Sequence, residues 1–284
     1  MSSRTQIEKQ IETIEGLRDI IGSMRSLAAI YLSRAEERLD GVRAYAETVE
    51  SAIEDSLFGR VIMLPEDIGR GSAILAFFSE QGLCGRFNEV MAEAAAECAA
   101  TVEAPGVIAV GRRGPALLGR AGLHVIAELP STTSPDGQDA VIHRIARTVI
   151  RTLAGDEYGR LYLLYARYLS PGRIEPQFER ILPVDLEKWR DRKDPHRTEP
   201  RLGLPRRRLL AELVSEYAFI SLFRAMTESL AGENGMRLQS MEAARSNIED
   251  TLEDLQLKIR IQRQNEITEE LLDVVSGAEA LRTD

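Results

Sequence analysis

Proline is absent from both ends of this 284-residue chain, because all 11 prolines lie between Pro65 and Pro205. A proline inside a helix removes an N–H donor and clashes with the preceding turn. Residues 1–64 and 206–284 are therefore each free to form a long helix. Fourteen of the 21 glycines fall between the first and the last proline, so this middle part is expected to be a turn-rich domain.

Other features that the sequence lacks argue against membrane-spanning, secreted, nucleic-acid-binding and disulfide-rich proteins. No run of about 20 apolar residues occurs, so nothing in the chain is expected to span a bilayer. The first residues, MSSRTQIEKQ, lack a basic start followed by an apolar stretch, and we expect no secretory signal. The net charge of −9 argues against nucleic-acid binding, which needs a basic face. The two cysteines, Cys84 and Cys98, are too few for a disulfide framework or a structural zinc site, which favours a reduced cytoplasmic setting.

An apolar stripe runs through the first 57 residues. Its fourteen steps cover 50 residues, about 3.57 residues per step, which lies between the coiled-coil and α-helix repeats. This spacing predicts one long helix with a continuous apolar seam. The residues of the stripe are Ile7, Ile11, Ile14, Leu17, Ile21, Met24, Ala28, Tyr31, Ala35, Leu39, Val42, Ala46, Val49, Ile53 and Leu57.

The C-terminal part has a similar stripe from about residue 206 to 276, and Gly277 is expected to end the helix. Thr227, Asn234 and Gln262 interrupt this stripe. Helices this long need a partner along their length. We therefore predict that the two terminal helices form an antiparallel coiled coil with the middle domain inserted between them. The alternative is a bundle of shorter helices, broken at Gly22 and Gly41.

The middle part alternates apolar runs with helical patterns, which predicts an α/β domain of Rossmann-like type with a largely parallel sheet. Helices are expected at residues 87–100, 115–120 and 138–153. Five runs are expected to be strands, namely Ser72–Ser79, Gly106–Gly111, His124–Leu129, Arg160–Leu169 and Ile174–Leu182.

Four segments follow from these patterns. The expected division is an N-terminal coiled-coil helix (1–62), an α/β domain (63–183), a charged linker (184–205) and a C-terminal coiled-coil helix (206–284). Pro205 is expected near the first turn of the second long helix, where proline is tolerated.

No catalytic constellation emerges from the residues. The turn Gln81–Asn88 (QGLCGRFN) contains neither a dinucleotide-binding glycine pattern nor a P-loop, so no nucleotide or other cofactor is expected. Cys84 in this turn is either a nucleophile or, more simply, a buried thiol. The three histidines share no ligand spacing, so no metal site is expected; they are His124, His143 and His196.

Several motifs in order along the chain resemble the gamma subunit of F-type rotary ATP synthases. Near the N-terminus these are Gly22–Ala29 (GSMRSLAA) and Arg34–Arg38 (RAEER). The C-terminal part is similar to the family over Ser229–Ala244 (SLAGENGMRLQSMEAA) and Arg263–Leu281 (RQNEITEELLDVVSGAEAL). In the middle, the turn GLCG with the asparagine three positions later also matches, and its residues are Gly82, Leu83, Cys84, Gly85 and Asn88. This chain has Arg86 and Phe87 where the family turn continues with glycine and leucine.

The resemblance implies a central-stalk rotor subunit without catalytic residues of its own. It would couple ATP synthesis or hydrolysis on the catalytic beta subunits to proton translocation by the membrane rotor ring. The implied partners are the ring of three alpha and three beta subunits, the epsilon subunit and the membrane c-ring. The implied location is the cytoplasmic face of the membrane, as a peripheral part of the ATP synthase complex.

The resemblance also assigns contact residues. The family's rotor–stator coupling contacts fall on Arg263, Gln264, Thr268 and Glu270. Met24 and Arg25 match the family's methionine and basic residue on the opposing N-terminal helix, where the two helices pass each other. The resemblance also implies that the GLCG turn belongs to the foot of the stalk.

Three alternatives stay open at this point. The first is the gamma subunit of a sodium-pumping rotary ATPase, because the membrane ring selects the ion. The second is a coiled-coil scaffold that does not rotate. The third is a small-molecule-binding α/β domain flanked by helices.

Overall fold

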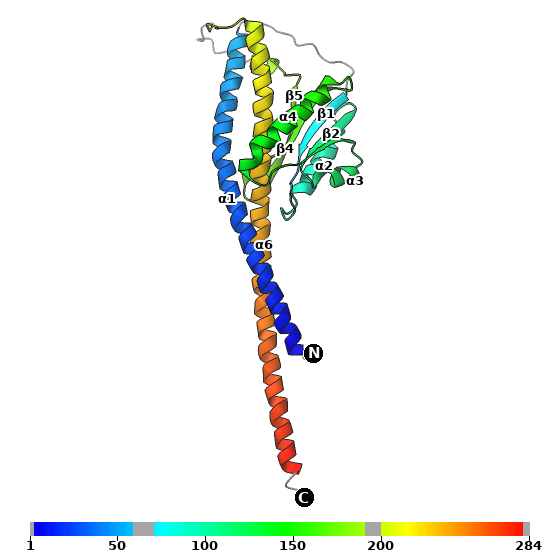
Figure 1. The fold of residues 1–284 in the computed structure, drawn as a ribbon, viewed down its shortest axis with the longest axis vertical. Coiled ribbons are helices and arrows are strands. Elements are labelled where there is room, and N and C mark those ends of the chain that lie inside the picture. Colours follow the sequence, from blue (N-terminus) through cyan, green and yellow to red (C-terminus); the bar gives the residue numbers. More distant parts are fainter. Residues whose placement is uncertain (1–2, 59–70, 191–199, 281–284) are drawn as a thin grey trace. The chain divides into compact units, whose positions relative to one another are not determined.

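The computed structural model describes residues 3–58, 71–190 and 200–280. Two long helices, α1 (Ser3–Leu57) and α6 (Arg206–Ala280), precede and follow a five-stranded α/β domain (Figure 1). They contain 55 and 75 residues, about 80 Å and 110 Å at 1.5 Å per residue. Helix α1 is unbroken, so the alternative of shorter helices is wrong.

The chain divides into two compact units. The large unit is Ala28–Ser240, and it contains the α/β domain with the adjoining parts of both long helices. The small unit is made of Met1–Leu27 and Met241–Asp284.

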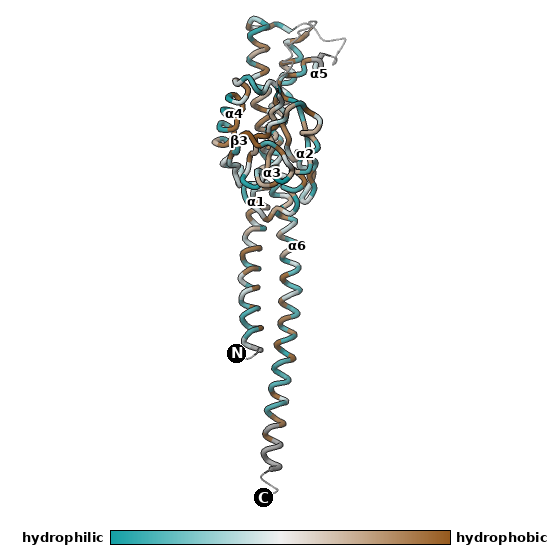
Figure 2. Tube along the Cα trace, turned by 90° about the vertical axis from the view of Figure 1, so that its right-hand side faces the viewer, coloured by the Kyte–Doolittle hydropathy of each residue, from teal (hydrophilic) through white to brown (hydrophobic). Residues whose placement is uncertain are grey.

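In the small unit the ends of α1 and α6 run antiparallel. Arg25 near one end bonds Glu242 at 3.0 Å, while Ile7 near the other end lies beside residues 258–269. Both helices alternate hydrophobic and hydrophilic positions along this stretch (Figure 2). The expected seam has one error here, because Leu17 exposes 48% of its surface.

In the large unit the buried face of α1 follows a heptad repeat. The buried residues alternate between steps of four and three, which is the spacing of a coiled-coil seam. Leu32 occupies the seam position expected for Tyr31, and Tyr31 is only half-buried. The seam residues are Ala28, Leu32, Ala35, Leu39, Val42, Ala46, Val49 and Ile53.

The sheet has the strand order β3-β2-β1-β4-β5. Neighbouring strands are parallel except for β4 and β5, which form an antiparallel hairpin at one edge. All five expected strands are present, and the prediction of a largely parallel sheet is confirmed. The strands are β1 (Gly71–Phe77), β2 (Pro105–Val110), β3 (Val125–Leu129), β4 (Tyr158–Ser170) and β5 (Arg173–Leu182).

Successive side chains of each strand enter different cores, because a strand alternates its faces. Leu75 and Phe77 of β1 pack with α4 (Gln138–Ala154) and the long helices, whereas Ile74 and Ala76 pack with the helices of the other face. Those helices are α2 (Phe87–Ala99) and α3 (Gly114–Arg120), and a one-turn 3-10 helix, Pro135–Gly137, precedes α4. The sheet is therefore covered on both faces, as a parallel sheet requires.

The segment expected to be a charged linker is partly folded. It contains the short helix α5 (Glu187–Arg190), and Trp189 is buried with its ring edge-on to Tyr217 of α6 at 5.0 Å. Two apolar residues of the same segment, Val184 and Leu186, are also buried. Burial of apolar area, rather than the sequence's charge, thus decides the structure of this stretch.

The structure tests the expected start and end of the C-terminal helix. Helix α6 begins directly after Pro205, whose carbonyl accepts the backbone N–H groups of Arg208 and Leu209. The expected stop at Gly277 is wrong, because α6 continues to Ala280. The expected boundary at residue 62, like residues 191–199 of the linker, lies outside the described residues. Within the described part of the chain, no helix is long and apolar enough to cross a membrane.

Candidate functional sites

The GLCG turn between β1 and α2 has an unusual backbone. Leu83 and Gly85 have positive φ angles of 62° and 57°, and such an angle is uncommon for a residue with a side chain. Leu83 exposes 61% of its surface, whereas Cys84 is buried. The turn therefore presents one apolar side chain outward and holds the thiol inside.

Asn88, at the start of α2, holds this turn against the end of β1. Its side-chain oxygen accepts the backbone N–H of Ser79 at 2.9 Å. Its amide nitrogen donates to the Ser79 hydroxyl at 2.8 Å and to the Cys84 sulfur at 3.3 Å. Burial raises the pKa of the Cys84 thiol, so Cys84 is a packed neutral group rather than an activated nucleophile.

Arg237 of helix α6 contacts the same turn and also belongs to a buried ion pair within the helix. The Arg237 guanidinium donates to the Glu233 carboxylate at 2.6 Å, and both side chains are almost fully buried. Arg237 also donates to the carbonyls of Gln81 and Gly82 at 3.4 and 3.3 Å, and to the Asn234 side-chain oxygen at 3.2 Å. Burial raises the pKa of Glu233 to about 7. One arginine thus joins α6 to the backbone of the turn.

A second contact joins α6 to the part of β4 that extends beyond β1. The ladder between β1 and β4 ends at Leu164, so the next backbone N–H groups on that side of β4 have no strand to pair with. The Ser229 hydroxyl accepts the N–H of Ala166 at 3.1 Å, and the Glu228 carboxylate accepts the N–H of Tyr168 at 3.0 Å. Side chains of α6 therefore replace the missing strand.

The same stretch of α6 is tied to α1 and α4. Arg43 of α1 donates to Glu228 at 2.6 Å. Gln138 of α4 donates to the Thr227 hydroxyl at 3.2 Å and accepts from Arg38 of α1, also at 3.2 Å. We call the buried polar residues of this stretch the junction, and they are Thr227, Glu228, Ser229, Glu233, Asn234 and Arg237.

Two glycines let the sheet approach the junction closely. A Cβ atom at Gly232 would lie 2.9 Å from the Cγ2 atom of Ile174, and one at Gly235 would lie 3.1 Å from the ring of Tyr168. The sequence reasoning did not find the junction as a site. Its signal was present, because Thr227 and Asn234 are polar residues that interrupt an apolar stripe.

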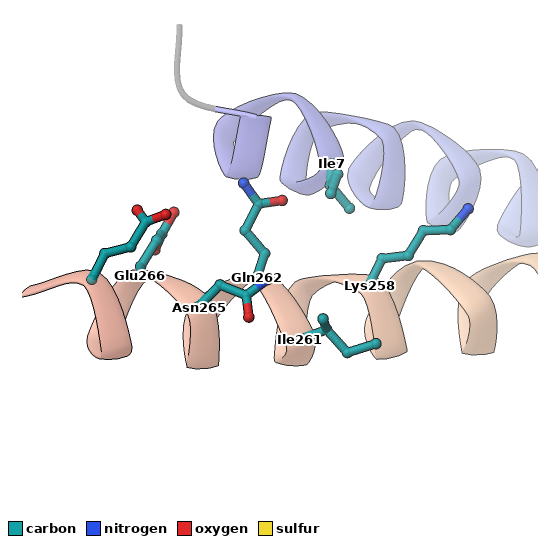
Figure 3. A pocket seen from close by; sticks show the side chains of 7 residues that line it. Ile7, Lys258, Ile261, Gln262, Asn265 and Glu266 are labelled. Atoms are coloured by element: carbon teal, nitrogen blue, oxygen red, sulfur yellow. The ribbon is translucent and has the colours of Figure 1, made fainter. Parts of the chain in front are cut away.

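The expected coupling residues lie on the part of α6 within the small unit. Arg263, Gln264, Thr268 and Glu270 are all exposed, and the Thr268 hydroxyl donates to the Gln264 carbonyl at 2.8 Å. A groove lined by Ile7 of α1 and by six side chains of α6 runs along the same stretch (Figure 3). These side chains are Lys258, Ile261, Gln262, Asn265, Glu266 and Glu269.

Met24 and Arg25 are not brought together with those residues. Both side chains are half-buried, and Arg25 bonds Glu242. Glu242 is 21 residues before Arg263 on α6, which is about 31 Å along the helix. The two sets of expected contacts are therefore separate places on the helix pair.

A family model described as ATP synthase matches residues 3–281 of this chain. The chain belongs to the ATP synthase family. The ATP synthase gamma chain of Lachnoclostridium phytofermentans is 28% identical over 292 residues, which cover 99% of this chain and 100% of that one. The ATP synthase gamma chain of Syntrophobacter fumaroxidans is 27% identical over 293 residues, with the same coverage.

Solved structures of this family have the same fold. A chain of the Euglena gracilis mitochondrial ATP synthase, in an OSCP/F1/c-ring structure, matches with a TM-score of 0.70 at 15% identity, over 99% of this chain and 95% of that one. A chain of the Tetrahymena thermophila mitochondrial ATP synthase, in a structure of the central stalk and c-ring, matches with a TM-score of 0.57 at 19% identity. That match covers 79% of this chain and 99% of that one. The resemblance to the gamma subunit and the predicted fold, long terminal helices around an α/β insert, are both confirmed.

Proposed function

We propose that this chain is the central-stalk rotor subunit of an ATP synthase. It would couple ATP synthesis or hydrolysis on the catalytic beta subunits to ion translocation by the membrane rotor ring. The observation that carries the proposal is the pair of helices of 55 and 75 residues around an α/β insert, in a chain that aligns end to end with gamma chains.

The large unit has the mechanical property that a rotor needs. Torque has to pass between the long helices and the α/β domain without slip. The junction joins α6 to β4, α1, α4 and the GLCG turn through hydrogen bonds that are buried or part-buried. Buried polar groups are costly to leave unpaired, so these bonds resist displacement more than exposed ion pairs do.

Four residues of α6 would contact the stator. Arg263 and Gln264 are exposed on the helix, and Thr268 and Glu270 follow within two turns. An arginine fork donates in parallel to carboxylates or carbonyls, which suits a contact with a loop of the beta subunit. Met24 and Arg25 would belong instead to the contact between the two helices where they pass each other, and Arg25 pairs with Glu242 of α6 at 3.0 Å.

The GLCG turn would belong to the foot of the stalk, which binds the epsilon subunit and the c-ring. The exposed Leu83 is the side chain that this turn offers to a partner. Of the two departures from the family turn, Phe87 is buried in the core, whereas Arg86 is exposed and pairs with Glu93 at 3.3 Å. Only Arg86 would therefore change the contact surface.

The remaining assignments follow from membership of a rotary complex. The chain would carry no catalysis, since ATP turnover would occur on the beta subunits of the alpha–beta ring. It would lie at the cytoplasmic face of the membrane as a peripheral subunit. The translocated ion would be the proton, with a sodium-pumping complex as the alternative.

The test is a double substitution, Arg263→Ala with Gln264→Ala, in the assembled complex. We expect the complex to assemble and to hydrolyse ATP, but to pump fewer ions per ATP than the wild type. The measurement is ATP-driven ion uptake into vesicles together with the hydrolysis rate.

A matched control replaces another arginine and another glutamine of the same helix with alanine, as Arg245→Ala with Gln256→Ala. This control should keep wild-type coupling. Wild-type coupling in the Arg263 and Gln264 double variant would disprove their assignment. If a tagged wild-type chain recovers no alpha or beta subunits from its host, the rotor proposal itself is wrong.

A further inference from the structure

The outer face of α4 carries a group of exposed arginines. His143, Arg144, Arg147 and Arg151 are exposed, and their spacing places them on one side of the helix. Ile150 lies beside them and exposes 67% of its surface. We call these five residues the α4 face.

Within residues 3–58, 71–190 and 200–280, the arginines of the α4 face have no acidic partner. Among the described residues, Arg147 donates only to the backbone carbonyl of His143, at 3.4 Å, and neither Arg144 nor Arg151 forms an ion pair. Some other helix-surface arginines of this chain do pair, for example Arg208 with Glu212 at 3.1 Å and Arg245 with Glu249 at 2.8 Å. The single acidic residue on the exposed side of α4 is Asp139, in the first turn.

This arrangement is unfavourable for the isolated chain. Arg144 and Arg147 are three residues apart, and Arg147 and Arg151 are four apart, so each pair of like charges lies side by side and repels. Arg151 gains some stabilisation from the C-terminal end of the helix dipole, but Arg144 and Arg147 do not. A partner with negative charge would relieve the repulsion.

The face is open to such a partner. Figure 1 shows α4 lying across one face of the sheet with no element in front of it, and Figure 2 shows it at the margin of the large unit. Its buried side already packs on the sheet through Val141, Ile142, Ile145 and Val149. The exposed side is therefore free to bind.

We propose that the α4 face is a docking site for an acidic surface of another protein subunit of the same complex. Carboxylates of the partner would pair with Arg144, Arg147 and Arg151, and an apolar side chain of the partner would cover Ile150. This inference rests on the proposed function, because it assumes that the chain works inside a complex.

Charge favours a protein partner over a lipid surface. The chain carries a net charge of −9, so an anionic bilayer would repel it as a whole. A protein contact needs complementary charge only over this face, whose arginines span about 10 Å along the helix. The planar arginine fork also matches carboxylates in a bidentate geometry.

The experiment places a photo-reactive amino acid at position 150 in the intact complex and maps its cross-links. We expect a cross-link to an acidic segment of another subunit. The triple variant Arg144→Gln, Arg147→Gln and Arg151→Gln should lower the yield by about tenfold, as expected for losing up to three partly solvated ion pairs. Glutamine keeps a similar helix propensity, so α4 should remain folded.

The control replaces three exposed arginines on other surfaces of the large unit, Arg120, Arg207 and Arg208, with glutamine, and should leave the yield unchanged. No cross-link to another subunit, a cross-link to a segment without acidic residues, or a yield equal in both triple variants would overturn the docking site. Capture of anionic lipid vesicles through the α4 face would assign it to the membrane instead and would also overturn the proposal. Each of these outcomes leaves the rotor proposal standing if alpha and beta subunits still co-purify.

Discussion

Replacing Glu228 with alanine would remove one of the two side-chain acceptors that join α6 to strand β4. Glu228 is 4% exposed, and its carboxylate accepts the Tyr168 N–H at 3.0 Å and the Arg43 guanidinium at 2.6 Å. Leaving the Tyr168 N–H unpaired in the interior costs about 1–3 kcal/mol. The Arg43 side chain is 45% exposed and can be solvated again, so losing its ion pair costs about 1 kcal/mol or less.

The expected loss of unfolding free energy for Glu228→Ala is therefore about 1–4 kcal/mol. Glu228→Gln keeps an oxygen for the Tyr168 N–H and should lose only about 1 kcal/mol. Arg43→Ala removes the ion pair alone and should lose about 1 kcal/mol or less.

Urea unfolding followed by fluorescence measures these differences, because Trp189 is the single tryptophan and is buried beside Tyr217. Hydrogen exchange at the Tyr168 amide gives a local readout, and Glu228→Ala should accelerate it more than Arg43→Ala does. If Glu228→Ala costs no more than Arg43→Ala, the bond to the strand is not what holds the junction, and the argument fails.

Further predictions concern the turn, the buried acid and the glycines. Asn88→Ala leaves the Ser79 N–H without its acceptor and should cost about 1–3 kcal/mol in urea unfolding, while Asn88→Asp, which keeps an acceptor oxygen, should cost less. Burial raises the pKa of Glu233 from 4.5 to about 7, so the folded chain holds this proton more tightly than the unfolded chain. Stability from this group is complete below about pH 4.5 and is lost as pH rises through about 7, and Glu233→Gln should abolish that part of the slope in urea titrations from about pH 5 to pH 8. Gly41→Ala should raise the melting temperature, because nothing lies within 4 Å of the new methyl group and alanine favours a helix by up to about 1 kcal/mol. Gly232→Ala should not raise it, since its methyl group would lie 2.9 Å from Ile174, and equal gains at both positions would contradict the packing described here.

The terminal helices are the part of the fold that local sequence specifies most fully. Proline is unfavourable in helix interiors, so its absence from both ends of the chain already indicates long helices. The apolar spacing from Ala28 to Ile53 depends only on residues that are close in the sequence. The errors in these helices come from tertiary packing. Leu32 rather than Tyr31 enters the seam, and α6 passes through Gly277, since a glycine lowers helix propensity without ending a helix.

The α/β domain was predictable for the same reason, because buried strands are continuous apolar runs between turns. What could not be read locally is the antiparallel direction of β5 and the packing of Trp189 on Tyr217. Both depend on contacts between residues that are distant in the sequence.

The junction shows the difference most clearly. Glu228, Ser229, Glu233 and Arg237 look like polar residues of an exposed helix face. The family resemblance marked Ser229–Ala244, which contains the last three, without giving them a role. Only the fold shows that they are buried, because Glu228, Ser229 and Arg237 bond backbone groups of β4 and of the GLCG turn, about 60 to 155 residues earlier in the chain. Glu233 is buried beside Arg237, with which it pairs. Composition and periodicity thus determined the long helices and the inserted sheet, which arise from local backbone preferences and apolar spacing. How the helix is fastened to the sheet was decided by tertiary structure, because a buried hydrogen bond exists only once both of its partners have been brought together.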